Sequence, residues 1–212
     1  MSQEIIIKIK REAQKYFKNN PPSHDWSHVE RVYKLALKIA KKEKADLFIV
    51  KLSVLLHDLG RKEEMKNPKK DHAEISKRLA LKILKKYNIN KKVIDNVLHC
   101  ISTHRFRNNK KPETREAKVL YDADKLDSMG AIGIARAYAW VGEQKIKLYS
   151  DKNFLGTGYE KEHSPVTEFL FKLSKLKDKM QTKTGKKIAK RRHKFMANYF
   201  KELNKEIRAN GN

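Results

Sequence analysis

Residues 47–60 read LFIVKLSVLLHDLG and form a strongly apolar stretch. Apolar side chains would cover nearly every face of a helix with this sequence, so we predict a helix that is buried on most sides. Asp46 is its expected N-cap, and Gly60 is expected to end it. The stretch closes on two adjacent ionisable residues, His57 and Asp58, which are unusual in such apolar surroundings.

Helical spacing continues on both sides of this stretch, because apolar residues recur at steps of three and four. No strict two-residue alternation lasts longer than about five residues. We therefore expect an all-α fold, with the whole chain, residues 1–212, forming one helical bundle domain. Its core motifs would lie within residues 24–140, and C-terminal helices within residues 164–208 would pack on them. The other expected helices are Ile5–Phe17, one capped by Ser27, one capped by Asp71, one capped by Asn90, residues 117–140 and residues 167–207.

The composition fits a helical globular protein with a strongly basic surface. Hydrophobic residues make up 39% of the 212 residues, and there are only 8 Gly and 5 Pro, which argues against both disorder and a many-stranded β protein. Fifty Lys and Arg against 25 Asp and Glu give a formal net charge of +25. This charge fits a nucleic-acid partner, a polyanionic small substrate or a solvated lysine-rich surface, and composition does not choose among them.

The single cysteine, Cys100, lies in an apolar stretch and cannot form an internal disulfide. We expect it to be a small buried hydrophobe, as in a protein of the reducing cytoplasm. The first residues, MSQEIIIKIK, include Glu4 and an apolar run of only three residues. This run is neither a signal peptide nor a membrane span, so we expect a cytoplasmic protein with no membrane contact.

Three separated segments combine histidine and aspartate: HDWSH at residues 24–28, LLHDLG at 55–60 and DADKLD at 122–127. His57 and Asp58 are the most informative pair. An ionised carboxylate at the end of an apolar helix is costly to bury unless a positive charge compensates it. Imidazole nitrogen and carboxylate oxygen are common metal ligands, so a bound metal ion is the simplest explanation.

The order His28, His57-Asp58, Asp124 resembles the HD superfamily of metal-dependent phosphohydrolases. The segments HVERV, LLHDLGR and DADKLD fall where the motifs of that family fall. A lone His-Asp pair has no weight, but one that closes an apolar helix about 30 residues after a first His is specific. Four further segments extend the resemblance over most of the chain, toward the small stand-alone members that act on nucleotides: HAEIS at 72–76, ISTHRF at 101–106, GAIGIARA at 130–137 and residues 164–196.

The resemblance implies a metal centre between helices, and Asp58 would also orient or deprotonate a water. This mixed nitrogen and oxygen set suits an open octahedral ion, Mn²⁺ first, with Fe²⁺, Co²⁺ and Mg²⁺ as alternatives. The implied ligands are His28, His57, Asp58 and Asp124. The implied orienting residues next to these ligands are His24, Asp122 and Asp127.

The substrate contacts are expected to be cationic or histidine side chains near the same motifs. Arg61 can bind phosphate bidentately from the end of the apolar helix. His72 and His104 match positions where relatives with two metals keep extra ligands, but Thr103 replaces one such histidine, so we predict phosphate contacts instead. The segment 105–107 is a further candidate through Arg105. Arg191, Arg192 and His193 are weaker candidates, and GTGY at 156–159 is given no role.

The expected reaction is hydrolysis of a phosphorylated small molecule by a metal-activated water. The resemblance points to nucleotides, including cleavage of nucleoside triphosphates to monophosphate and pyrophosphate. A phosphodiesterase acting on cyclic nucleotides or alarmones is an alternative. A basic nucleic-acid-binding protein that keeps the fold is a second alternative, less favoured because all four ligand positions are filled. The oligomeric state is left open.

Overall fold

The computed structural model describes residues 2–105, 110–149 and 164–208. All regular secondary structure in these ranges is helical, which confirms the all-α prediction. The chain divides into two compact units, Met1–Asp124 and Lys125–Asn212, and the boundary falls within helix α7 (Arg115–Asp127). The predicted packing of residues 164–208 on the core motifs, as parts of one domain, stays a prediction.

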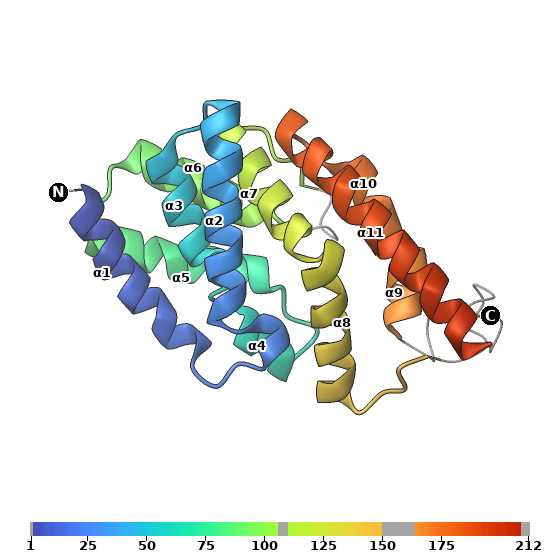
Figure 1. Cartoon of the computed structure of the whole chain (residues 1–212). Helices are drawn as coiled ribbons and strands as arrows, with labels where there is room; N and C mark the ends of the chain where they lie inside the picture. The colour runs from blue at the N-terminus through green and yellow to red at the C-terminus, as the bar shows by residue number, and fades with distance from the viewer. Residues whose placement is uncertain (1, 106–109, 150–163, 209–212) are drawn as a thin grey trace. The chain divides into compact units, whose positions relative to one another are not determined.

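The first unit is built around α3, which explains why that helix is apolar on nearly every side. Helices α1, α2 and α6 all pack against α3, while α5 packs against α6 and α4 against α5 (Figure 1). Leu52, Val54 and Leu56 of α3 have no solvent exposure. The helices of this unit before α7 are α1 (Ser2–Gln14), α2 (Trp26–Glu43), α3 (Leu47–Leu56), α4 (Arg61–Lys66), α5 (His72–Lys86) and α6 (Lys91–Thr103).

The second unit packs α8 against α9 and α11, with α10 also against α11. Phe169 and Phe200 stack with ring centroids 4.6 Å apart, and Met196 is fully buried. Gly130 begins α8 with φ +76°, a conformation that favours glycine. The helices of this unit are α8 (Gly130–Gln144), α9 (Pro165–Phe171), α10 (Leu176–Lys179) and α11 (Lys183–Ile207).

Three predicted helix caps are confirmed by their side-chain hydrogen bonds. Asp46 accepts from the backbone amides of Phe48 and Ile49, and the caps Asp71 and Asn90 each accept one amide at the start of α5 and α6. These side chains satisfy amides that have no partner within the helix. Polar residues ahead of an apolar periodic run therefore located these helix starts correctly.

Two predicted helix ends are wrong. Asp25, not Ser27, caps α2, because its carboxylate accepts the amide of Ser27 and the helix begins at Trp26. Gly60 does not end α3, which stops at Leu56; Gly60 precedes α4, a short helix that the sequence did not predict.

Two long segments are also interrupted. The predicted helix over residues 117–140 breaks after Asp127 into α7 and α8. Residues 167–207 fold as α9, a short 3-10 turn, α10 and α11 rather than one helical run. Most of the predicted loop at 151–165 lies outside the described residues.

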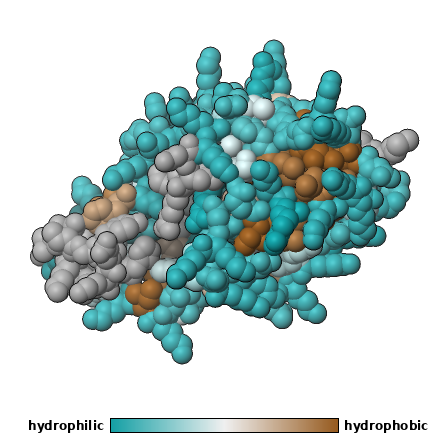
Figure 2. Space-filling model, turned by 180° about the vertical axis from the view of Figure 1, so that it is seen from behind, coloured by the Kyte–Doolittle hydropathy of each residue, from teal (hydrophilic) through white to brown (hydrophobic). Residues whose placement is uncertain are grey.

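The polar surface and the buried cysteine agree with the expectations from composition. Hydrophilic residues cover most of the face seen in Figure 2. None of the described helices is both long enough and apolar enough to cross a membrane. Cys100 is buried in α6, and burial raises the pKa of its thiol to about 12, as expected for a small buried hydrophobe.

Candidate metal centre

Six histidine and aspartate side chains from separate segments of the first unit come together between its helices. His57 and Asp58 follow the last residue of α3, and His104 follows the last residue of α6. His28 lies in the first turn of α2, and His72 begins α5. Asp124 comes from α7. The site is therefore assembled largely from helix ends, where the backbone can turn a side chain toward a shared interior.

The backbone fixes the proton of two of these histidines. Nδ1 of His57 lies 2.8 Å from the carbonyl oxygen of Val54, and Nδ1 of His104 lies 2.6 Å from that of Ile101. Because a carbonyl only accepts, each Nδ1 must carry the proton and donate it. With the proton on Nδ1, the Nε2 atom is the ring nitrogen that faces the interior of the site and can bind a metal ion. A buried imidazole held in this way is prepared to bind a metal ion.

One group of donors forms around His28 and His57. Their Nε2 atoms lie 3.3 Å apart, and Oδ1 of Asp124 lies 3.4 Å from the first and 3.9 Å from the second. Oδ2 of Asp58 lies 3.8 Å from each Nε2 atom. Burial lowers the pKa of His57 to about 4, so its ring is neutral at pH 7. The structure thus brings all four predicted ligands together.

A second group of donors forms on the other side of Asp58. Its Oδ1 atom lies 3.4 Å from Nε2 of His72 and 3.5 Å from Nε2 of His104, and these two nitrogen atoms are 3.1 Å apart. Asp58, His72 and His104 could therefore hold an ion, as could His28, His57 and Asp58. Thr103 is buried, and its hydroxyl donates to the carbonyl of His99. From the sequence, we expected His72 and His104 to contact substrate phosphate, and this stays a prediction. The distances in the structure add an alternative role, in which the two histidines bind a metal ion.

Arg61 faces the site, as predicted, and its guanidinium is paired with Asp58. Its Nε and Nη2 atoms lie 3.1–3.3 Å from the two carboxylate oxygens. Burial alone would raise the pKa of Asp58, but Arg61 and the neighbouring His57 hold that pKa well below its usual value. Asp58 is therefore ionised despite being buried. The expected contact of Arg61 with substrate phosphate stays a prediction.

Glu64 of α4 is a site residue that the sequence did not indicate. Its Oε2 atom lies 2.8 Å from Nη1 of Arg61 and 2.9 Å from Nδ1 of His72, and its Oε1 atom lies 2.9 Å from Arg105. Arg105 also contacts Asp71 at 2.8 Å. Burial opposes the ionised form of Glu64, but His72 and the two arginines lower its pKa to about 2. The only sequence feature that pointed to Glu64 was its spacing of three residues from Arg61, and this spacing places the two side chains together only in a helix, which was not predicted here.

The remaining predicted residues have other contacts. His24 lies in a 3-10 turn, where its Nδ1 atom is 2.8 Å from the hydroxyl of Ser23. Asp122 is fully buried in α7, and Asp127 is 3.1 Å from Arg136 in the second unit. The orienting roles of these three residues stay predictions.

The other candidates lie farther along the chain. Arg107 and the GTGY segment lie outside the described residues. In the second unit, Arg192 donates to the carbonyl of Leu126, and His193 stacks on Phe169.

The residues present fit a divalent ion. Nε2 of His57 presents a lone pair toward Nε2 of His28, 3.3 Å away, and a cation between the two rings could accept that lone pair. The carboxylate of Asp58, ionised and buried, supplies negative charge at the same point. A mixed set of nitrogen and oxygen donors suits ions that keep water ligands better than it suits a closed zinc site.

The helical fold and the His/Asp centre define a known class, and the chain belongs to the HD domain family, which it matches over residues 25–129. It is 37% identical over 203 residues to the uncharacterized protein YpgQ of Bacillus subtilis, an alignment that covers 94% of this chain and 92% of YpgQ. The structure of YpgQ in complex with ADP is similar, with a TM-score of 0.76, 34% identity and coverage of 97% of this chain and 96% of YpgQ. An HD-superfamily hydrolase from Bacillus thuringiensis has a TM-score of 0.77 at 29% identity, with coverage of 99% and 100%. The resemblance inferred from the motifs is confirmed, and the chain falls among HD-superfamily hydrolases.

Proposed function

We propose that this protein is a metal-dependent phosphohydrolase of nucleotides, acting foremost on nucleoside triphosphates to release nucleoside monophosphate and pyrophosphate. The observation that carries the proposal is the 3.3 Å separation between the Nε2 atoms of His28 and His57, with two carboxylates beside them. This donor set is suited to an ion that acts on phosphate oxygen. The ADP complex of YpgQ supports a nucleotide as the ligand class.

The proposed ligands are His28, His57, Asp58 and Asp124. A divalent ion such as Mn²⁺, when bound there, lowers the pKa of a coordinated water and polarises a phosphoryl oxygen. Fe²⁺, Co²⁺ and Mg²⁺ would serve the same donor set. The proton on Nδ1 of His57 keeps that ring in a fixed orientation, so its ligand atom is positioned before substrate arrives.

Asp58 acts on the attacking water mainly by orienting it. A carboxylate whose pKa is held well below its usual value is a weak base but remains a good hydrogen-bond acceptor. Arg61 holds this carboxylate in place from one side. The guanidinium groups of Arg61 and Arg105 supply positive charge beside the site, which offsets the negative charge developing on phosphate.

The test is a substrate panel with metal-free protein to which single divalent metals are returned. The panel contains nucleoside triphosphates, monophosphates, a phosphodiester, a cyclic dinucleotide and an alarmone, with products separated by ion-exchange chromatography. We expect pyrophosphate from triphosphates with Mn²⁺, and more than 100-fold loss of the rate in Asp58→Asn, on the order expected when a ligand is lost. Asp95→Asn is the matched control, since Asp95 is exposed on α6.

The outcomes separate the candidate functions. Inorganic phosphate or cleaved diesters as the main products would replace the proposed reaction with a phosphatase or a phosphodiesterase on the same centre. No turnover of any compound with any metal would contradict the enzymatic proposal itself.

A further inference from the structure

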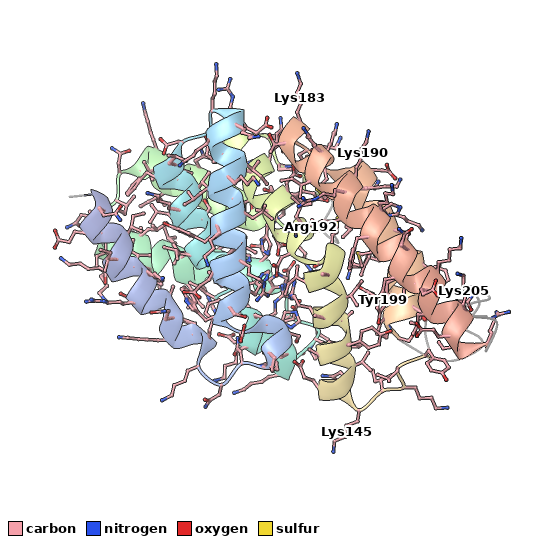
Figure 3. The ribbon with its side chains drawn as sticks, in the orientation of Figure 1. Lys145, Lys183, Lys190, Arg192, Tyr199 and Lys205 are labelled. Atoms are coloured by element: carbon pink, nitrogen blue, oxygen red, sulfur yellow. The ribbon has the colours of Figure 1, made fainter. Side chains whose placement is uncertain are left out.

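Helix α11 of the second unit carries a stripe of exposed lysines. Lys183, Lys187, Lys190, Lys194 and Lys201 follow one another at steps of four, three, four and seven residues, the spacing of a single helix face. All five side chains are exposed. Figure 3 shows Lys183 and Lys190 pointing away from the helix on its outer side. We call these five residues the lysine stripe.

No carboxylate of the described residues is paired with the stripe. The segment from residue 179 to residue 201 contains no Asp or Glu. The nearest acidic residues on either side, Asp178 and Glu202, are themselves paired with Lys177 and Lys205. None of the ion pairs found among the described residues includes a member of the stripe. Its positive charge is therefore directed to solvent.

An exposed aromatic ring stands beside the stripe. Phe195 is 52% exposed, which is unusual for a phenylalanine, and Arg191 lies one helical turn before it on the same side. Arg191 is also exposed. Cations that follow a line together with an accessible ring are the combination that single-stranded nucleic acids bind, through phosphates and through base stacking.

The opposite side of α11 is not available to a partner. Ala189, Met196 and Phe200 are buried within the second unit, and Tyr199 packs against Tyr138 of α8, toward which it points in Figure 3. A basic helix that binds a membrane surface inserts an apolar face into the lipid. The apolar face of α11 is already covered, so this helix offers lipid only its charge and a single ring.

The length of the stripe requires an extended ligand. Lys183 and Lys201 are 18 residues apart, and a helix rises about 1.5 Å per residue, so the stripe spans roughly 27 Å. One strand of a B-form duplex carries a phosphate about every 3.4 Å along its axis, and an extended single strand spaces its phosphates more widely, so up to about eight phosphates lie along that distance. A mononucleotide has its charges in one place and would meet one or two lysines.

From these observations we propose that the lysine stripe, with Arg191 and Phe195, is a sequence-independent binding surface for single-stranded nucleic acid. The phosphodiester backbone lies along the lysines, and a base stacks on Phe195. This surface goes beyond the proposed hydrolysis and does not depend on it.

The test is fluorescence anisotropy with a labelled 20-nucleotide single strand, as DNA and as RNA, and with the corresponding DNA duplex, over a series of salt concentrations. We expect a Kd of about 1–100 μM near physiological salt, as for sequence-independent binding. Charge reversal of Lys187, Lys190 and Lys194 to Glu should raise the Kd at least tenfold. It should also reduce the slope of log K against log salt by about 2, since each phosphate contact on a single strand contributes about 0.7.

The matched control reverses three exposed lysines of α2, Lys34, Lys38 and Lys41, which have nearly the same helical spacing. This control changes the net charge by the same amount, so a surface effect on α11 is separated from an effect of total charge. We expect the control to raise the Kd less than threefold. Phe195→Ala should weaken single-strand binding about fivefold or more and leave duplex binding unchanged.

Four results would overturn the proposal. These are no binding to any strand at low salt, equal losses in the α11 and α2 triple variants, tighter binding to anionic lipid vesicles than to nucleic acid at the same salt, and unchanged single-strand binding in Phe195→Ala. Tighter binding to DNA or to RNA would identify which of the two nucleic acids this surface binds. Asp58→Asn should retain full strand binding, so failure of the proposed hydrolysis and failure of this surface are distinguished.

Discussion

The Nε2 atoms of His28 and His57 lie 3.3 Å apart, although the two residues are 29 positions apart and belong to different helical segments. Both rings are almost completely buried. The proton of His57 is on the opposite nitrogen, where it is donated to the carbonyl of Val54. His57 therefore has only a lone pair to offer at this contact, and a cation between the rings would stabilise the folded state.

The first prediction concerns this stabilisation. Mn²⁺ at about 100 times its Kd should raise the free energy of unfolding by about 2.7 kcal/mol, because the ion binds the folded chain. His57→Gln should lose most of this increase. Urea unfolding of metal-free protein, with and without Mn²⁺, measures it. His99→Gln is the control, since Nε2 of His99 accepts the amide of Glu113 outside the cluster. If Mn²⁺ raised the free energy of unfolding of His57→Gln as much as that of the unchanged protein, His57 would not be a metal ligand.

The second prediction concerns the number of ions. Asp58 turns one oxygen toward His28 and His57 and the other toward His72 and His104. We expect two bound Mn²⁺ per chain at saturation, the second held more weakly, and one in His72→Gln. Equilibrium dialysis with elemental analysis counts them. A single ion in both proteins would leave His72 free for the predicted contact with substrate phosphate.

Arg61 carries the third prediction. Removing one partner of a buried ion pair leaves the other charge uncompensated, which typically costs 3–5 kcal/mol. Arg61→Ala should therefore lower the free energy of unfolding of the metal-free protein by about 3 kcal/mol and raise the pKa of Asp58. Arg78→Ala, an exposed arginine of α5, should change stability by less than about 0.5 kcal/mol. Urea unfolding in the presence of a chelator compares the two. A loss in Arg61→Ala no larger than in Arg78→Ala would show that Arg61 does not stabilise Asp58.

The sequence predicted the four ligands through the resemblance of their motifs to the HD family. The structure brings these four side chains together, and their role as metal ligands stays a prediction. His57 and Asp58 end an apolar run, and the cost of burying a carboxylate there already implied a compensating cation. The helix caps Asp46, Asp71 and Asn90 were predictable for a similar reason, since a cap bonds to amides two or three residues ahead.

The contacts of Glu64 could not be predicted in this way. They join α4, the start of α5 and the residue after His104, and these segments meet only through tertiary packing. The same is true of Gly60. From the sequence it was interpreted as a helix terminator, but its role is to let the backbone pass close to α5.

The fourth prediction is that Cys100 does not react in the folded protein. Its pKa of about 12 leaves about one thiolate in ten thousand chains at pH 8, and the side chain has no solvent exposure. A thiol reagent should label the native protein only as fast as it unfolds, and should label one thiol per chain at once in concentrated guanidinium. Rapid labelling of the native protein would contradict the buried position of Cys100.

The fifth prediction compares two glycines. A Cβ atom at Gly60 would lie 2.6 Å from both the carbonyl oxygen of His72 and Cβ of Ile75, whereas one at Gly142 of α8 would meet nothing within 4 Å. Gly60→Ala should therefore lower the free energy of unfolding by about 1–3 kcal/mol through overpacking. Gly142→Ala should raise it by up to about 1 kcal/mol, because alanine favours a helix.

Guanidinium unfolding of the two variants beside the unchanged protein measures both effects. Gly60→Ala should also weaken Mn²⁺ binding, because Gly60 follows Asp58 by two residues and its amide donates to Ser76 of α5. A shift of this backbone would move Asp58 relative to His72. Equal stability of the two alanine variants would contradict the close approach at Gly60. Loss of stability with unchanged metal affinity would show that the turn after α3 positions α5 but not the ligands.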